Sequence, residues 1–110
     1  MSIRIDEQAC VGCGRCIRVC PGSLLKLVPG ETGGVAAIES PEDCWGCVSC
    51  VKECAFSAIH FYLAEDISGK DGPRTTMQVR AEGPLLHWDF SKDGALFRTI
   101  TVDRRNSNDY

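Results

Sequence analysis

The sequence predicts an α+β fold with two parts, a pseudo-twofold core and a small three-stranded antiparallel sheet that follows it. Two observations predict the core: a cysteine pattern that occurs twice, and β-like segments on both sides of each copy. A third observation predicts the sheet. After a segment rich in Gly, Asp and Ser, the chain resumes with three β-like runs separated by turn residues.

The core is predicted from the repeated cysteine motif. Residues 10–20, CVGCGRCIRVC, and residues 44–54, CWGCVSCVKEC, both have the form C-x2-C-x2-C-x3-C. Short helices are expected at residues 15–20 and 48–54, each with its last two cysteines four residues apart on one face. Pro21-Gly22 ends the first helix, because Pro cannot continue the hydrogen-bond ladder. Strands are expected around the two motifs at residues 2–5, 24–28, 35–39 and 58–63.

The sheet is predicted from the composition after the core. Gly83-Pro84 and Asp93-Gly94 are turn signals, and the second is a strong hairpin signal. They separate strands expected at residues 75–81, 85–90 and 96–102. Because side chains alternate along a strand, one face is expected to pack on the core, and the other to meet a second chain through aromatic residues. The expected domains are a cluster core (1–63), a loop (64–74), a β extension for docking (75–103) and a polar tail (104–110).

All eight cysteines of the 110 residues fall between Cys10 and Cys54. Disulfides, zinc or iron–sulfur clusters can explain this density. The first residues lack the basic-then-apolar profile of a secretory signal, so a reducing, cytoplasmic location is expected, where disulfide frameworks are rare. No apolar run exceeds four residues, so no membrane span is expected. The net charge of −3 disfavours nucleic acid as a partner, because phosphates require a basic surface.

The cysteine spacing favours two [4Fe–4S] clusters. Such a cluster offers one open position on each of four irons, and three cysteines of a C-x2-C-x2-C loop can bind three of them. Structural zinc typically uses two separated ligand pairs, and it remains the second interpretation. In the bacterial run C-x2-C-x2-C-x3-C-P, the fourth cysteine ligates the other cluster. Cys20 is followed by Pro21 as in that run, whereas Cys54 is followed by Ala55.

The expected ligand sets are therefore crossed between the motifs. One cluster is expected to be bound by Cys10, Cys13, Cys16 and Cys54, and the other by Cys44, Cys47, Cys50 and Cys20. Gly12, Gly14 and Gly46 allow backbone N–H groups to approach cluster sulfurs. No catalytic residue is predicted, because no P-loop or H-E-x-x-H motif is present, and His60 and His87 stand alone in β-like runs.

The two-cluster core, residues 2–63, resembles a bacterial-type 2[4Fe–4S] ferredoxin, which implies a ferredoxin-like fold. Residues 41–54, PEDCWGCVSCVKEC, resemble more narrowly the β subunit of adenylylsulfate reductase, and the resemblance continues through residues 73–76, PRTT, and the strand around Trp88. It implies electron transfer to or from a FAD-containing α subunit of adenylylsulfate-reductase/fumarate-reductase-like type, on which the β extension docks. It also implies that Trp45 lies by the cluster nearest the flavin. The alternative role for Trp45 is to shield a cluster from water.

Two features distinguish this sequence from that subunit. Its first motif has regular spacing without an insertion, and no long C-terminal arm is expected, since the sequence ends at Tyr110. The resemblance therefore leaves the substrate of the complex open. The alternative function is a free soluble dicluster ferredoxin that serves several redox enzymes. A further electron carrier is expected as a second partner of the chain.

Overall fold

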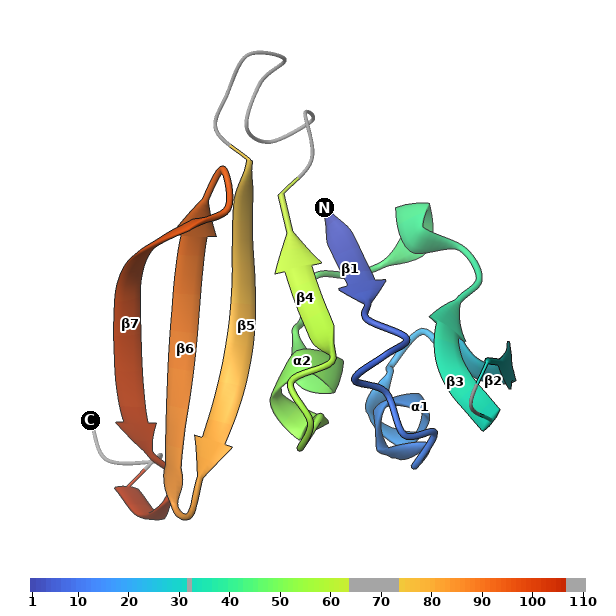
Figure 1. Ribbon diagram of the computed structural model, residues 1–110, viewed down its shortest axis with the longest axis horizontal. Helices are drawn as coiled ribbons and strands as arrows, with labels where there is room; N and C mark the ends of the chain where they lie inside the picture. The colour runs from blue at the N-terminus through green and yellow to red at the C-terminus, as the bar shows by residue number, and fades with distance from the viewer. Residues whose placement is uncertain (32, 64–73, 107–110) are drawn as a thin grey trace.

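The computed structural model describes residues 1–31, 33–63 and 74–106 (Figure 1). The expected loop at residues 64–74, apart from Arg74, and the end of the expected polar tail lie outside the described residues. The elements are, in chain order, β1 (Ser2–Ile5), α1 (Arg15–Val19), β2 (Leu25–Gly30), β3 (Gly33–Ile38), the 3₁₀ turn η1 (Pro41–Asp43), α2 (Ser49–Glu53), β4 (Ile59–Tyr62), β5 (Thr75–Glu82), β6 (Leu85–Lys92), β7 (Ala95–Asp103) and the 3₁₀ turn η2 (Arg104–Asn106).

Five of the strands form one antiparallel sheet in the order β1-β4-β5-β6-β7, and β2 and β3 form a separate hairpin (Figure 1). The expected order of strand, cysteine loop, helix and strand occurs twice, as β1-α1-β2 and as β3-α2-β4. The three strands expected after the core are present, but they do not form a sheet of their own. β5 pairs with β4, with Phe61 opposite Met77 and Tyr62 opposite Thr76, so the extension continues the sheet of the core.

The core lies between this sheet and α2. Side chains of directly opposed residues in an antiparallel pair share one face, and Ile3, Ile59, Val79 and Leu86 are buried on the same face of the sheet. Val51 of α2 is buried against them in one apolar cluster. Burying such side chains fully contributes about 1.5–3 kcal/mol each. The cluster therefore fixes α2, and with it Cys50, on the sheet.

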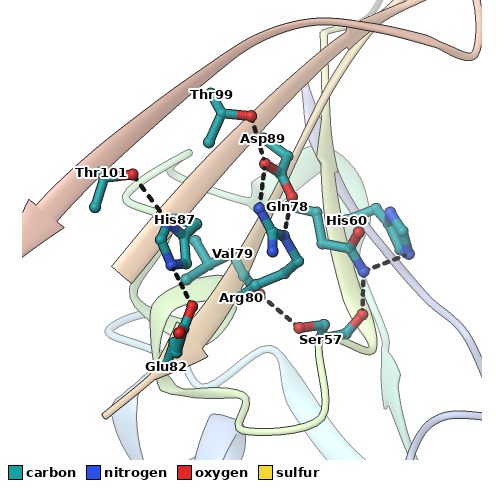
Figure 2. Close-up of polar contacts among 10 residues, drawn as sticks. All are labelled: Ser57, His60, Gln78, Val79, Arg80, Glu82, His87, Asp89, Thr99 and Thr101. Atoms are coloured by element: carbon teal, nitrogen blue, oxygen red, sulfur yellow. Dashed lines mark hydrogen bonds and ion pairs between the residues drawn. The ribbon is translucent and has the colours of Figure 1, made fainter. Parts of the chain in front are cut away.

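The opposite face of the sheet is polar and internally hydrogen-bonded, as Figure 2 shows. Asp89 accepts hydrogen bonds from the Arg80 guanidinium (3.1 Å to Oδ1) and the Thr99 hydroxyl (2.8 Å), and the Arg80 guanidinium lowers the pKa of Asp89. His87 contacts Glu82 (3.0 Å) through Nε2 and Thr101 (2.9 Å) through Nδ1. His87 therefore has partners on neighbouring strands, which suits a structural side chain.

The apolar face extends past the core. Trp88 and Phe90 of β6 are half-buried, whereas Phe97 and Ile100 of β7 are exposed. The sequence predicts that one face of the extension packs on the core and that the other meets a second chain. That expectation is wrong about the faces, because a single apolar face packs on the core at β4, at β5 and at Leu86 of β6, and leaves Phe97 and Ile100 of β7 exposed. We call Trp88, Phe90, Phe97 and Ile100 the extension patch.

Candidate metal centres

The eight cysteines surround two cavities. The first, which we call the Cys44 cavity, is lined by Cys20, Cys44, Cys47 and Cys50. Cys44 directly follows η1, Cys50 lies in α2, and Cys20 caps the C-terminal end of α1. Apolar side chains including Pro21, Trp45 and Phe61 complete its wall. Three of its cysteines therefore come from the second motif and one from the first.

The second cavity, which we call the Cys10 cavity, is lined by Cys10, Cys13, Cys16 and Cys54. Cys16 lies in α1, and Cys54 caps the C-terminal end of α2. The wall also includes Val11, Arg15 and Phe56. The two groups of cysteines brought together are the two sets expected from the spacing. Each helix contributes a cysteine to one cavity and ends in a cysteine that lines the other.

The donor arrangement suits a cluster better than a single ion. Among the residues that the structure describes, no three Cys, His, Asp or Glu side chains lie close enough together to hold one metal ion. Four thiols spaced around an apolar hollow instead match a cube with one open position on each of four irons. Backbone N–H groups donate to three of the sulfurs at 3.4 Å: Leu24 to Cys20, Ala36 to Cys10, and Ala58 to Cys54. Such hydrogen bonds stabilise thiolate ligands and tune a cluster's potential.

The loop around the Cys10 cavity requires glycine at one position. Gly12 has a φ of +72°, and a Cβ added there would lie 2.4 Å from the carbonyl oxygen of Gly34 in β3. No side chain fits that space unless the β2–β3 hairpin moves. Gly12 therefore allows the loop between Cys10 and Cys13 to lie directly against the hairpin.

Burial controls the ionisation of the inner thiols. It raises the pKa of Cys50 to about 12, and it also raises the pKa of Cys16, with neighbouring cysteines adding to both shifts. Cys47 is exposed, and hydrogen bonds from the hydroxyl and backbone N–H of Ser49 lower its pKa. At neutral pH the buried thiols therefore keep their protons until iron displaces them, so metal binding releases protons.

Trp45 lies at the mouth of the Cys44 cavity and is 67% exposed. Its indole nitrogen approaches the Pro21-Gly22 turn that follows the first motif, 3.8 Å from the position of a Cβ on Gly22. Trp45 therefore covers part of a cavity that both motifs build. It also presents a large aromatic surface to solvent.

Some residues of the sites are not predicted by the sequence. Val11 and Phe56 are exposed apolar side chains at the Cys10 cavity. Val48, which precedes α2, has a φ of +57°, a strained conformation for a β-branched residue. Alignment of the two motifs gives a signal for two of these residues. Val11 stands in the first motif where Trp45 stands in the second. Val48 stands in the second motif where Gly14, whose φ is +78°, stands in the first.

Two adjacent tetracysteine cavities on a small sheet with two short helices define a dicluster iron–sulfur protein. Comparison with known families agrees, since the model of the 4Fe-4S dicluster domain matches residues 3–61, more than half of the sequence. The chain belongs to the 4Fe-4S dicluster domain family. It is therefore an iron–sulfur electron-transfer protein with a ferredoxin-like dicluster domain, and its eight cysteines support two [4Fe–4S] clusters.

The relatives of this chain include ferredoxins and a reductase subunit. Ferredoxin-3 of a Nostoc species is 34% identical over 64 residues, which cover 46% of this chain and 66% of that protein. Ferredoxin-3 of Rhodobacter capsulatus is 32% identical over 72 residues, which cover 47% of this chain and 71% of that protein. The β subunit of adenylylsulfate reductase from Megalodesulfovibrio gigas is 38% identical over 60 residues, which cover 50% of this chain and 35% of that subunit. In the described residues, no helix is long and apolar enough to cross a membrane.

Proposed function

We propose that this chain is the iron–sulfur subunit that relays electrons through two clusters to or from a FAD-containing oxidoreductase subunit. The relay rests on how close the two cavities lie. Helices α1 and α2 pack together, and the charge of Cys16, from the Cys10 cavity, contributes to the raised pKa of Cys50, from the Cys44 cavity. Clusters in the two cavities would form a short path through one small domain.

We assign the crossed ligand sets to the two clusters. The proposed ligands are Cys10, Cys13, Cys16 and Cys54 for one cluster, and Cys44, Cys47, Cys50 and Cys20 for the other. The lining of the two cavities supports this assignment. Because each set takes its fourth cysteine from the other motif, neither cluster would be fully bound unless both motifs fold.

The single observation that carries the subunit role is the extension patch. A free carrier needs only the cluster core, yet β7 adds the apolar side chains Phe97 and Ile100, which stay exposed beyond the core. Phe97 is 50% exposed, and its ring lies 6.4 Å from that of Phe90. Aromatic side chains of this kind dominate the energetics of protein interfaces. The relative from Megalodesulfovibrio gigas is by name a β subunit, which fits a docking role for this extra sheet.

We place the flavin side of the relay at Trp45 and the Cys44 cavity. An exposed indole against a cluster offers a packed, water-excluding contact to a partner, whereas a ring that only shields the cluster needs no partner. A further electron carrier would then exchange electrons with the cluster in the Cys10 cavity. A cytoplasmic location fits thiolate ligands that must stay reduced.

The second candidate function is a free dicluster ferredoxin. The two relatives named Ferredoxin-3 favour it, because the matched regions cover 66% and 71% of those proteins. In that case the β extension would be a family-specific addition to a carrier with several enzyme partners.

Affinity purification from the native host under anaerobic conditions separates the two functions. The tagged chain should recover a partner with flavin absorbance. Phe97→Asp should lose the partner, whereas Leu96→Asp should retain it. Both residues are exposed on β7, but Leu96 pairs with Ser91 of the polar face. Recovery of the chain alone, active with unrelated redox enzymes, would make it a free ferredoxin.

A further inference from the structure

The outer edge of β7 is a long strand edge with no described strand beside it. The strand order of the sheet ends at β7, so no other described strand lies along this side. Residues along a strand direct their backbone N–H and C=O groups to alternate sides, so every second residue of β7 points these groups away from β6. Strand β7 has nine residues, compared with four in β1 at the opposite edge, and its residues 95–101 are all exposed.

This edge carries few of the features that usually keep strand edges from pairing. Such features are Pro, inward-pointing charges, very short strands and bulges. The bulge between β6 and β7 is at Phe97, and beyond it β7 pairs regularly with β6 as far as Asp103. Between the bulge and Asp103 the only charged residue is Arg98, which lies opposite Phe90 on the apolar face and is the one protective charge of this stretch. The large apolar side chain Ile100 is 41% exposed. The regular part of the edge is therefore open to another strand.

We propose that this edge pairs antiparallel with β7 of a second copy of the chain, on a twofold axis at Ile100. The sequence of the edge is complementary to itself in this register. Ile100 would face its own copy, Arg98 would face Val102, and Thr99 would face Thr101. Opposed β-branched side chains stabilise antiparallel strands, and no like charges are opposed. A twofold interface requires one surface to match itself in this way.

Pairing at the edge leaves Trp88, Phe90 and Phe97 of the extension patch available, whereas Ile100 would contact its own copy. The patch lies on one face of the sheet, whereas the edge bonds lie in its plane. The second copy would continue the same sheet, so two patches would lie on one face of a ten-stranded sheet, five strands from each copy. The inference is independent of the proposed flavoprotein partner, since it concerns only the isolated chain.

The test uses the cluster-loaded chain under anaerobic conditions. Analytical ultracentrifugation over a concentration series should give a species of twice the chain mass. Ile100→Lys would oppose two positive charges on the axis and should raise the dissociation constant at least roughly tenfold. Ile100→Thr keeps a β-branched residue and should remain a dimer. Iron content confirms that each variant is folded.

The register has its own test at Val102. Val102→Glu would face Arg98 of the other copy and should strengthen the dimer at low salt, whereas Val102→Arg should weaken it. Both changes place a charge at the same half-buried position, so an equal effect of the two would refute the register.

Hydrogen exchange followed residue by residue identifies the bonded edge. In the dimer, successive amides from Arg98 to Val102 should all be slow. In Ile100→Lys, every second amide should exchange at least roughly tenfold faster, because its hydrogen bond is lost. A chain that is monomeric at all concentrations, or a dimer whose outer amides stay fast, would overturn the proposal. So would protection of these amides only in a complex with a different protein.

Discussion

Replacement of Gly12 by Ala tests how the cysteine loop is held against the β2–β3 hairpin. The left-handed backbone at Gly12, with a φ of +72°, costs a residue with a Cβ about 1–2 kcal/mol. The new Cβ would lie 2.4 Å from the Gly34 oxygen, whereas ordinary contact begins at 3.4 Å. The hairpin must therefore retreat by about 1 Å, and such overpacking costs about 1–3 kcal/mol. The expected destabilisation is about 2–5 kcal/mol in total.

Gly14→Ala is the matched control for this prediction. Gly14 has a similar φ of +78°, but an added Cβ there meets nothing within 4 Å. It should cost only the backbone term, about 1–2 kcal/mol. The assay is anaerobic thermal unfolding at one scan rate, followed by loss of the visible iron–sulfur absorbance. Gly12→Ala should melt at least about 4 °C below Gly14→Ala, since 1 kcal/mol shifts the midpoint of a domain of this size by several degrees. Equal midpoints for the two variants would refute the close packing of loop and hairpin.

Three further predictions concern the ligands, the electron path and pH. Cys20→Ser should remove the cluster of the Cys44 cavity, and Cys54→Ser should remove that of the Cys10 cavity. Each variant should lower the iron content from about eight to about four per chain. Paramagnetic spectra that show each variant losing the cluster of its own motif would contradict the crossed ligand sets. Trp45→Leu should keep its iron but slow electron exchange with the flavoprotein in stopped-flow mixing, and unchanged rates would favour the shielding role. Burial lowers the pKa of His60 below its ordinary value of 6.5. The unfolded chain therefore protonates the His60 imidazole more readily than the folded chain does, and folding stability is lost as the pH falls below about 6.5. His60→Gln should therefore lose less thermal stability than the native chain between about pH 7.5 and 5.5, and an identical loss would show that His60 is not responsible.

Locally encoded features were predictable from the sequence. The Asp93-Gly94 signal gave the β6–β7 turn, and both residues have positive φ, at 50° and 85°. The cysteine spacing likewise indicated three thiols of each set, because these three lie on one short loop, whereas the fourth comes from the other motif. These features depend on a few neighbouring residues, whose chemistry restricts the backbone directly.

Long-range features were not predictable from the sequence. The pairing of β4 with β5 joins segments separated by the expected loop at residues 64–74, and nothing local in either strand specifies its neighbour. The β-bulge at Phe97 was not predictable either, because it arises from the pairing of β7 with β6. Simple alternation along β7 would place Leu96 and Ile100 on the same face of the sheet. The extra residue of the bulge instead places Leu96 beside Ser91, on the polar face.

The continuity of the sheet connects the cluster core to the extension patch. Ile3 and Phe61 line the Cys44 cavity and pair with each other across β1 and β4. Phe61 pairs in turn with Met77 of β5, and Met77 with Phe90 of the extension patch. One row of apolar side chains therefore runs across four strands, from the wall of a cluster site to an exposed surface. A continuous row of this kind would hold the distance between a cluster and the proposed docking surface fixed. A separate sheet on a linker would leave that distance variable, so pairing β5 directly to the core suits a chain that presents one cluster to one partner.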